Sequence, residues 1–169
     1  DTPWTSARLR DGTRCPSGRV KFRDVAPGES DYGAVRQGRA TLLVRKADVA
    51  DVNRDGQNDT LVHFLCQRTN KDVGYSYYYV YSFKKLRGYH GKGRYQPVVL
   101  DYVTSSDFAS NGRWSIQTID ARRGAVDVRQ WVRAKRSITV DRTFRWSDRR
   151  GLVASRPLPV YPQADRAPR

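Results

Sequence analysis

The residues with the clearest chemical potential lie in one short segment, from Asp51 to Asp59. Oxygen-bearing side chains stand at positions 1, 3, 5 and 9 of this segment, as Asp51, Asn53, Asp55 and Asp59. Gly56 permits a sharp turn that a side chain would obstruct, and Gln57 offers its backbone carbonyl at position 7. Hard cations such as calcium take roughly six to eight oxygen ligands, and one tightly turned loop can supply most of them. The spacing therefore predicts a calcium site, not a catalytic one.

The segment differs from an EF-hand loop, which ends in a bidentate glutamate and lies between two helices. Position 12 is Val62 here, and the flanking stretches 40–44 and 60–65 are rich in β-branched and apolar residues. Such flanks are typical of strands. We therefore expect an acidic loop between two strands, although an Asx-rich turn without a metal is the alternative that the same residues allow.

The string from Ala50 to Val62 resembles the calcium loop of FG-GAP repeats, of the integrin and VCBS types. The resemblance implies a calcium-binding loop, in what we otherwise expect to be a small secreted bacterial protein. We expect a structural cation, because it would relieve the repulsion among three carboxylates. The resemblance also implies side-chain ligands at Asp51, Asn53, Asp55 and Asp59, and a backbone ligand at Gln57. Arg54 stands where the family usually has a small residue, often glycine, so its charge would weaken binding. The string occurs once, whereas a propeller needs several blades, so the resemblance implies a local loop and no global fold.

The wider chain predicts a mainly β fold, namely an antiparallel β-sandwich, a barrel or a strongly curved sheet with little helix. Eight or nine short strands are expected at intervals of about ten residues. They cover 19–23, 40–47, 59–67, 75–83, 97–103, 114–119, 125–132, 138–146 and 152–154. We expect one domain over residues 1–155, followed by a Pro-rich tail over 156–169, because four prolines there argue against a strand in a sheet centre.

Composition and cysteine usage favour an exported protein with an anionic partner. Cys15 and Cys66 are about fifty residues apart and lack metal-type spacing, so we expect one disulfide, worth about 4 kcal/mol in the chain-entropy model. A redox-active or reactive thiol and two free buried thiols in a cytosolic protein are the alternatives. No apolar run approaches the length of a membrane span. The net charge of +15 attracts polyanions such as anionic cell-wall polymers. Nucleic acid is an alternative without a supporting motif, and a solvated basic surface without a particular partner remains open.

A stripe of aromatic residues offers a second candidate site. Period two places the tyrosines of segment 75–83 on one face of a strand, followed by a basic group. This candidate ligand face comprises Tyr75, Tyr77, Tyr79, Tyr81, Lys84, Lys85 and Arg87. Aromatic rings can stack on bases or sugars while the cations hold phosphates. The alternative is plain packing, because tyrosine is a frequent half-buried strand residue.

Catalytic motifs are not found in the sequence. The chain contains no GxSxG or HExxH string, and its only glutamate is Glu29. A carboxylate pair among Asp101, Asp107 and Asp120 is the enzymatic alternative that spacing leaves open. We therefore expect a secreted or cell-envelope binding protein with a structural calcium loop. A polyanion-binding protein and a small secreted hydrolase or inhibitor module are the alternatives.

Overall fold

The computed structural model describes most of the middle and the C-terminal half of the chain. The described residues are 6–9, 18–21, 23–24, 33–37, 40–68, 71–85, 95–104, 114–132 and 137–159. Side chains are described over the narrower ranges 41–44, 48–65, 76–84, 96–104, 114–132 and 137–159. Cys15, Arg87 and Asp107 lie outside the described residues, and Tyr75, Lys85 and Cys66 are described only in their backbone.

Two antiparallel sheets form the described fold. The first contains six strands in chain order: β3 (Arg23–Asp24), β4 (Gly33–Gln37), β5 (Ala40–Ala50), β6 (Asp59–Arg68), β7 (Lys71–Lys85) and β8 (Tyr95–Thr104). The second contains four: β9 (Trp114–Arg122), β10 (Ala125–Val132), β11 (Ile138–Ser147) and β12 (Gly151–Ala154). A separate pair joins β1 (Ser6–Leu9) to β2 (Gly18–Lys21). Consecutive strands pair throughout each sheet, because short connections allow only antiparallel neighbours.

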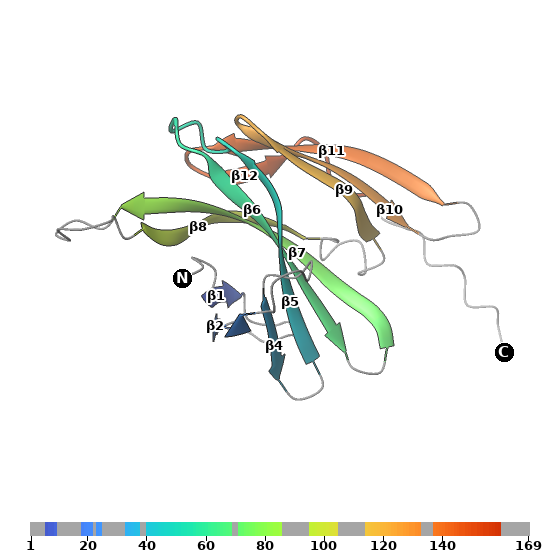
Figure 1. The fold of residues 1–169 in the computed structure, drawn as a ribbon. Helices are drawn as coiled ribbons and strands as arrows, with labels where there is room; N and C mark the ends of the chain where they lie inside the picture. Colours follow the sequence, from blue (N-terminus) through green and yellow to red (C-terminus); the bar gives the residue numbers. More distant parts are fainter. Residues whose placement is uncertain are drawn as a thin grey trace.

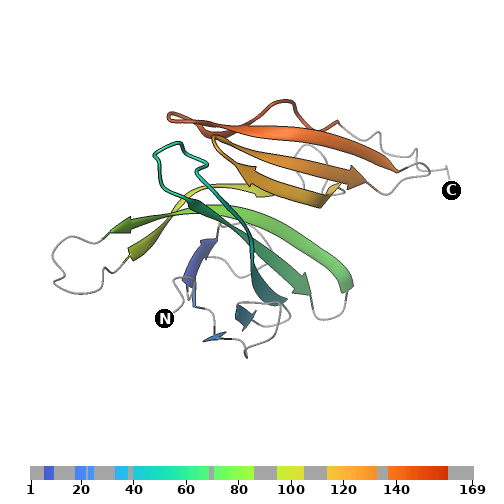
Figure 2. The same ribbon diagram turned by 45° about the horizontal axis from the view of Figure 1, so that its top comes forward.

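The two sheets face one another as in a sandwich (Figure 1). The four-stranded sheet covers one end of the six-stranded sheet, and Figure 2 shows the tip of the β5–β6 hairpin reaching towards it. The described residues contain no helix. The prediction of a mainly β, antiparallel fold is therefore confirmed, and the sandwich is the one of the three expected architectures that the described residues match.

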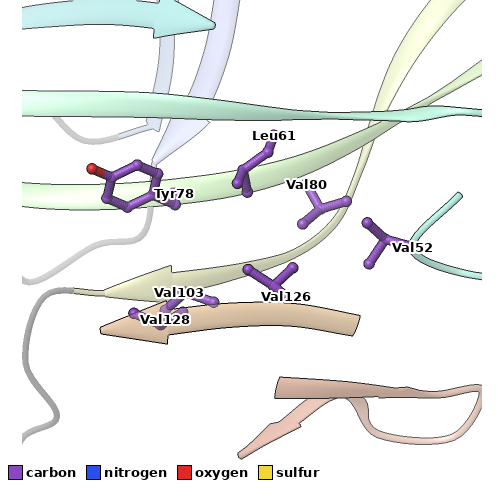
Figure 3. Packing of buried hydrophobic residues seen from close by; sticks show 7 residues of the cluster. All are labelled: Val52, Leu61, Tyr78, Val80, Val103, Val126 and Val128. Carbon is purple, nitrogen blue, oxygen red and sulfur yellow. The ribbon is translucent and has the colours of Figure 1, made fainter. Parts of the chain in front are cut away.

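An apolar core fills the space between the sheets. Its buried members come from the β5–β6 loop and four strands: Val52, Leu61, Tyr78, Val80, Val103, Val126 and Val128. Figure 3 shows Val52 entering this core from the loop, beside Val80 and opposite Val126 on β10. Because Val52 is fully buried, the loop is an integral part of the packing between the sheets.

Strand β7 is longer than the sequence indicates. The composition of segment 69–74 favours a turn, yet β7 begins at Lys71, and Gly74 pairs with Gln67 of β6. The pairing with β6 overrides the local turn preference, and a register shift between Gln67 and Arg68 accommodates the extra residues.

A smaller core lies at the opposite end of the second sheet. Trp114, Val132 and Val140 pack there with Leu158, whose side chain is 4% exposed. Leu158 belongs to the segment predicted as a Pro-rich tail. Arg156 lies just before it, and its carbonyl accepts a hydrogen bond of 2.9 Å from Nε of Arg142. The first residues after β12 are thus held against the sheet.

Candidate metal centre

The acidic loop connects β5 to β6 and is shaped by its own polar side chains. The Oδ1 atom of Asn53 accepts the backbone N–H of Asp55 at 3.0 Å, and Oδ1 of Asp55 accepts that of Gln57 at 2.8 Å. These are Asx turns, in which a side chain replaces a backbone carbonyl. Arg54 and Gly56 adopt left-handed conformations, with φ of 64° and 87°. The chain therefore curls tightly between two paired strands.

Asp59 closes the loop from the first residue of β6. The residue is 0% exposed, and its Oδ2 accepts the backbone N–H groups of Val52 and Asn53 at 2.9 and 3.1 Å. Its Oδ1 is buried and has no hydrogen-bond partner. An unpartnered buried carboxylate oxygen destabilises the fold, because it loses its hydrogen bonds to water and no protein donor replaces them. This oxygen is one of two buried side-chain oxygens in the loop that lack a partner.

The second unpartnered oxygen belongs to Asp51, the first residue of the loop. The Asp51 side chain is 14% exposed, and Nε of Arg123 lies 3.5 Å from its Oδ2. Its Oδ1 is buried without a hydrogen-bond partner. The two orphaned oxygens thus come from positions 1 and 9 of the predicted site, and both suit a cation as their missing partner.

The other predicted ligands lie on the open side of the loop. Asn53 is partly exposed, whereas Asp55 and Gln57 are exposed. The Nδ2 group of Asn53 donates to Oδ2 of Asp55 at 2.9 Å, so these two side chains are already in contact. Within the described residues, no three His, Cys, Asp or Glu side chains are gathered closely enough to hold a metal. A cation in this loop would therefore also rely on the oxygen of Asn53 and on the carbonyl of Gln57.

Electrostatics at Asp59 reflect its burial. Burial raises the pKa of the Asp59 carboxyl, and the negative charge of Asp55 adds to this rise. The backbone N–H groups of Asn53 and Val52 act in the opposite direction. The Ser82 hydroxyl also does so from nearby, although it is not placed to donate a hydrogen bond to Oδ1. A bound divalent cation would favour the ionised form in the same way as these donors, because its charge is opposite in sign.

Arg54 packs its side chain against the β9–β10 turn. Its guanidinium covers Gly124 in the β9–β10 turn so closely that a Cβ at Gly124 would collide with it. The left-handed φ of Arg54 also gives a physical reason for glycine at this position in loops of this kind, because residues with a Cβ resist that conformation. The structure therefore gives Arg54 a docking contact.

Gly56 provides a clean test of the loop's backbone. A Cβ at this position would meet nothing within 4 Å, so Gly56→Ala creates no clash. We expect the variant to lose about 1 kcal/mol of unfolding free energy, because alanine resists a φ of 87°. Urea unfolding in a chelator measures this loss. An unchanged midpoint would show that the loop relaxes to another conformation.

The loop docks onto the β9–β10 hairpin of the other sheet. The backbone N–H of Gly124 donates to the carbonyl of Asp51 at 3.0 Å. The N–H of Ala121 donates to Oδ2 of Asp48 at 2.7 Å, and a register shift between Lys46 and Asp48 marks a bulge in this part of β5. Sequence reasoning missed Asp48, Arg123 and Gly124, because these contacts join residues about seventy positions apart.

The tyrosine stripe lies on the face of β7 turned away from the second sheet, because Tyr78 and Val80 occupy the face between the sheets. Tyr79 and Tyr81 are each 3% exposed. The Tyr79 ring packs edge-on against Phe64 and stacks with Tyr102, at centroid distances of 5.2 and 5.4 Å. These contacts favour the packing interpretation for these two rings. Tyr77 is partly exposed and Lys84 is exposed.

The aspartates considered for catalysis have different surroundings. Asp101 is partly buried and accepts the backbone N–H groups of Tyr102 and Leu152, so it holds β12 beside β8. Asp120 is exposed on the outer face of the second sheet. It lines an open groove of about 520 Å³ together with Asp127, Arg129 and Asp141. Arg122 and Arg129 form ion pairs there with Asp127 and Asp141, respectively.

One aromatic contact of the first sheet is a stack that the sequence does not indicate. The ring of His63 lies parallel to that of Tyr78 at 4.3 Å, and its Nε2 is 3.0 Å from the Ser76 hydroxyl. The sequence predicts a hydrogen-bonded strand histidine at this position, and its alternation with Leu61 and Leu65 is the signal. The contacts assign His63 a packing role.

Comparisons with known proteins give no relative for this chain. No family model, curated protein or solved structure matches it. Across the part of the chain that the structure describes, no helix is both long and apolar enough to cross a membrane.

Proposed function

We propose that this chain is a calcium-stabilised binding protein in which Asp51, Asn53, Asp55, Gln57 and Asp59 hold one cation. The observation that carries the proposal is the pair of buried oxygens, Oδ1 of Asp51 and Oδ1 of Asp59, that lack any hydrogen-bond partner. They stand at the first and last proposed ligand positions of the loop. The sequence spacing of the loop's oxygen-bearing side chains favours calcium independently of this burial.

Calcium fits the donor set better than other common metals. All five donors are oxygens, from three carboxylates, one amide and one carbonyl, and hard cations prefer oxygen. Magnesium demands a near-ideal octahedron and keeps several of its waters, so it suits this curled loop less well. A transition metal would favour imidazole or thiolate, and the loop contains neither.

The cation would fasten the two sheets together. Asp51 would bind it through the side chain while its carbonyl accepts the N–H of Gly124 in the second sheet. Val52, the next residue, is fully buried between the sheets. Fixing the loop around a cation would therefore also fix the attachment of β9 and β10.

The proposed location is secreted or at the cell envelope, where this role would be possible. Extracellular calcium modules bind in the range of about 10⁻⁴ to 10⁻³ M, so they are filled only where calcium is abundant. The predicted disulfide between Cys15 and Cys66 belongs to the same kind of compartment. The partner proposed for the net charge of +15 is an anionic cell-wall polymer or another polyanion, with nucleic acid as the alternative.

Calorimetric titration of calcium into chelator-treated protein tests the proposal. We expect one binding event per chain and a rise in melting temperature that grows with calcium concentration, because ligands of the native state stabilise it by mass action. Magnesium at the same concentration serves as the control and should have a much smaller effect. Absence of both heat and thermal shift with calcium would refute the cation site.

The pH dependence of stability gives a further prediction. The pKa of Asp59 is raised by burial, so the native state holds this proton more tightly than the unfolded chain does. Metal-free protein should therefore lose stability as pH rises from about 4, the unfolded value, through the raised folded value. Calcium should reverse the loss, because the ion binds the deprotonated carboxylate.

Urea unfolding of the wild type and Asp59→Asn at a series of pH values isolates this effect. The lowered pKa values of Asp127 and Asp141, caused first by their hydrogen bonds to Arg122 and Arg129, give a slope of opposite sign at lower pH. Both proteins contain those pairs, so the difference between the two curves reports Asp59. Parallel curves would mean that Asp59 is not proton-linked to folding.

A further inference from the structure

Two arginines border the acidic loop where it meets the second sheet. Arg123 has a side chain that is 77% exposed, with Nε 3.5 Å from Oδ2 of Asp51. The guanidinium of Arg54 lies over Gly124 in the same turn. Oδ1 of the same Asp51 carboxylate is one of the two oxygens proposed for the cation. If Oδ1 of Asp51 binds calcium, the exposed guanidinium of Arg123 therefore lies beside Oδ2, the other oxygen of the same carboxylate.

The charge of this region would change sign when a cation binds. The ionised side chains of the loop and turn are Asp51, Asp55, Asp59, Arg54 and Arg123, which together carry one negative charge. A divalent cation converts this to one positive charge. The empty loop therefore repels anions, whereas the filled loop places two cationic groups side by side at the surface, where an anion would relieve their repulsion.

The filled loop would also have room for an outside ligand. The second carboxylate oxygens are already engaged, Oδ2 of Asp59 by two backbone N–H groups and Oδ2 of Asp51 by Arg123. With each carboxylate binding through one oxygen, the protein supplies five oxygens, whereas calcium takes roughly six to eight, so at least one position falls to water or to another molecule. Asp51 and Asp59 enclose the buried side, while Asp55 and Gln57 are exposed on the other. The open position therefore faces solvent.

We propose that the calcium-filled loop and Arg123 together form a calcium-dependent site for an oxyanion, a phosphate or carboxylate group. One oxygen of the ligand completes the coordination of the cation and another accepts a hydrogen bond from Arg123. This inference rests on the proposed function, because it requires the cation. Phosphate and carboxylate share the required geometry, since each presents two oxygens that match the guanidinium fork.

Terbium luminescence tests the site directly. Terbium replaces calcium in oxygen-rich loops, and its lifetimes in H₂O and D₂O report the number of waters on the metal. The metal alone should retain at least one water in the wild type. Methyl phosphate and acetate are the two probes, and each should displace water in proportion to its affinity. The probe that binds more tightly shows whether the site prefers a phosphate or a carboxylate group.

Arg123→Gln is the diagnostic variant, and Arg129→Gln is its matched control. Both arginines are exposed and both lie beside an aspartate, but Arg129 pairs with Asp141 on the outer face of the sheet. Arg123→Gln should bind terbium and yet bind the better probe about tenfold more weakly, because it loses a charge-assisted hydrogen bond. Arg129→Gln should match the wild type. The affinity of Arg123→Lys for the probe should lie between those of Arg123→Gln and the wild type, since lysine keeps the positive charge and lacks the two parallel N–H donors of the guanidinium.

The failure of this inference is distinguishable from failure of the cation site. Terbium bound without any coordinated water, or water that neither probe displaces, would overturn the oxyanion site and leave the calcium proposal standing. Equal probe affinity in Arg123→Gln and the wild type would also overturn it. Absence of terbium binding, confirmed by absence of calcium heat, would overturn the proposed function itself.

Discussion

Replacing Asp59 by Asn should abolish the response of the protein to calcium. Asp59 supplies one of the two buried orphaned oxygens, and an amide nitrogen or a neutral oxygen there is a poor substitute for a carboxylate. We expect calcium affinity to fall at least about a hundredfold. Mutation of residues that only hydrogen-bond to metal ligands already lowers metal affinity about tenfold to a hundredfold, and loss of a ligand should lower it further. Calorimetry and the calcium dependence of the melting temperature measure this fall.

The same variant should be at least as stable as the wild type in a chelator. The wild-type carboxylate is buried with one oxygen unpartnered, and desolvation of that charge costs free energy when no cation is present. The introduced amide can still accept the N–H groups of Val52 and Asn53 through its single oxygen. Asp120→Asn, which removes an exposed carboxylate, is the control and should keep the full calcium response. Equal calcium affinity in Asp59→Asn and the wild type would exclude Asp59 as a ligand.

Replacing Val52 by Ala should weaken the fold by about 2 kcal/mol. Val52 is 0% exposed and packs into the core between the sheets, so the truncation leaves a cavity among Leu61, Val80 and Val126. Val49→Ala is a matched control on the same hairpin, because Val49 is 38% exposed. It should change stability by no more than about 0.5 kcal/mol. Urea unfolding in a chelator measures both variants.

Calcium binding should also weaken in Val52→Ala, although Val52 contributes no ligand. The residue anchors the loop between Asp51 and Asn53, and a looser loop must be ordered when the cation binds. Val49→Ala should bind calcium as the wild type does. If the two variants lost equal stability, the loop would not be part of the core in solution.

The strands of this protein could be predicted because their signals are local. Alternating residues in 125–132 place Val126 and Val128 inward, with Asp127 and Arg129 outward, and β10 follows this pattern. Gly124 marks the β9–β10 turn through its positive φ of 75°. A turned loop between two strands was likewise predictable, since its oxygen-bearing side chains, its glycine and its apolar flanks lie within one short segment.

The environment of the loop could not be predicted, because it is assembled from distant parts of the chain. Nothing near Asp48 or Asp51 in the sequence indicates Ala121, Arg123 and Gly124 as their neighbours. The tyrosine stripe was ambiguous for a related reason. Alternation separates the two faces of β7, but it cannot show that Tyr79 and Val80 are both buried on opposite faces.

A crystal structure with terbium in place of calcium would test the cation site most directly, because the anomalous signal of terbium locates the ion without any assumption about the loop. We expect one peak about 2.3–2.6 Å from Oδ1 of Asp51 and Oδ1 of Asp59. A map without that peak, in which the two carboxylates turn to solvent or bond to protein donors, would contradict the cation site.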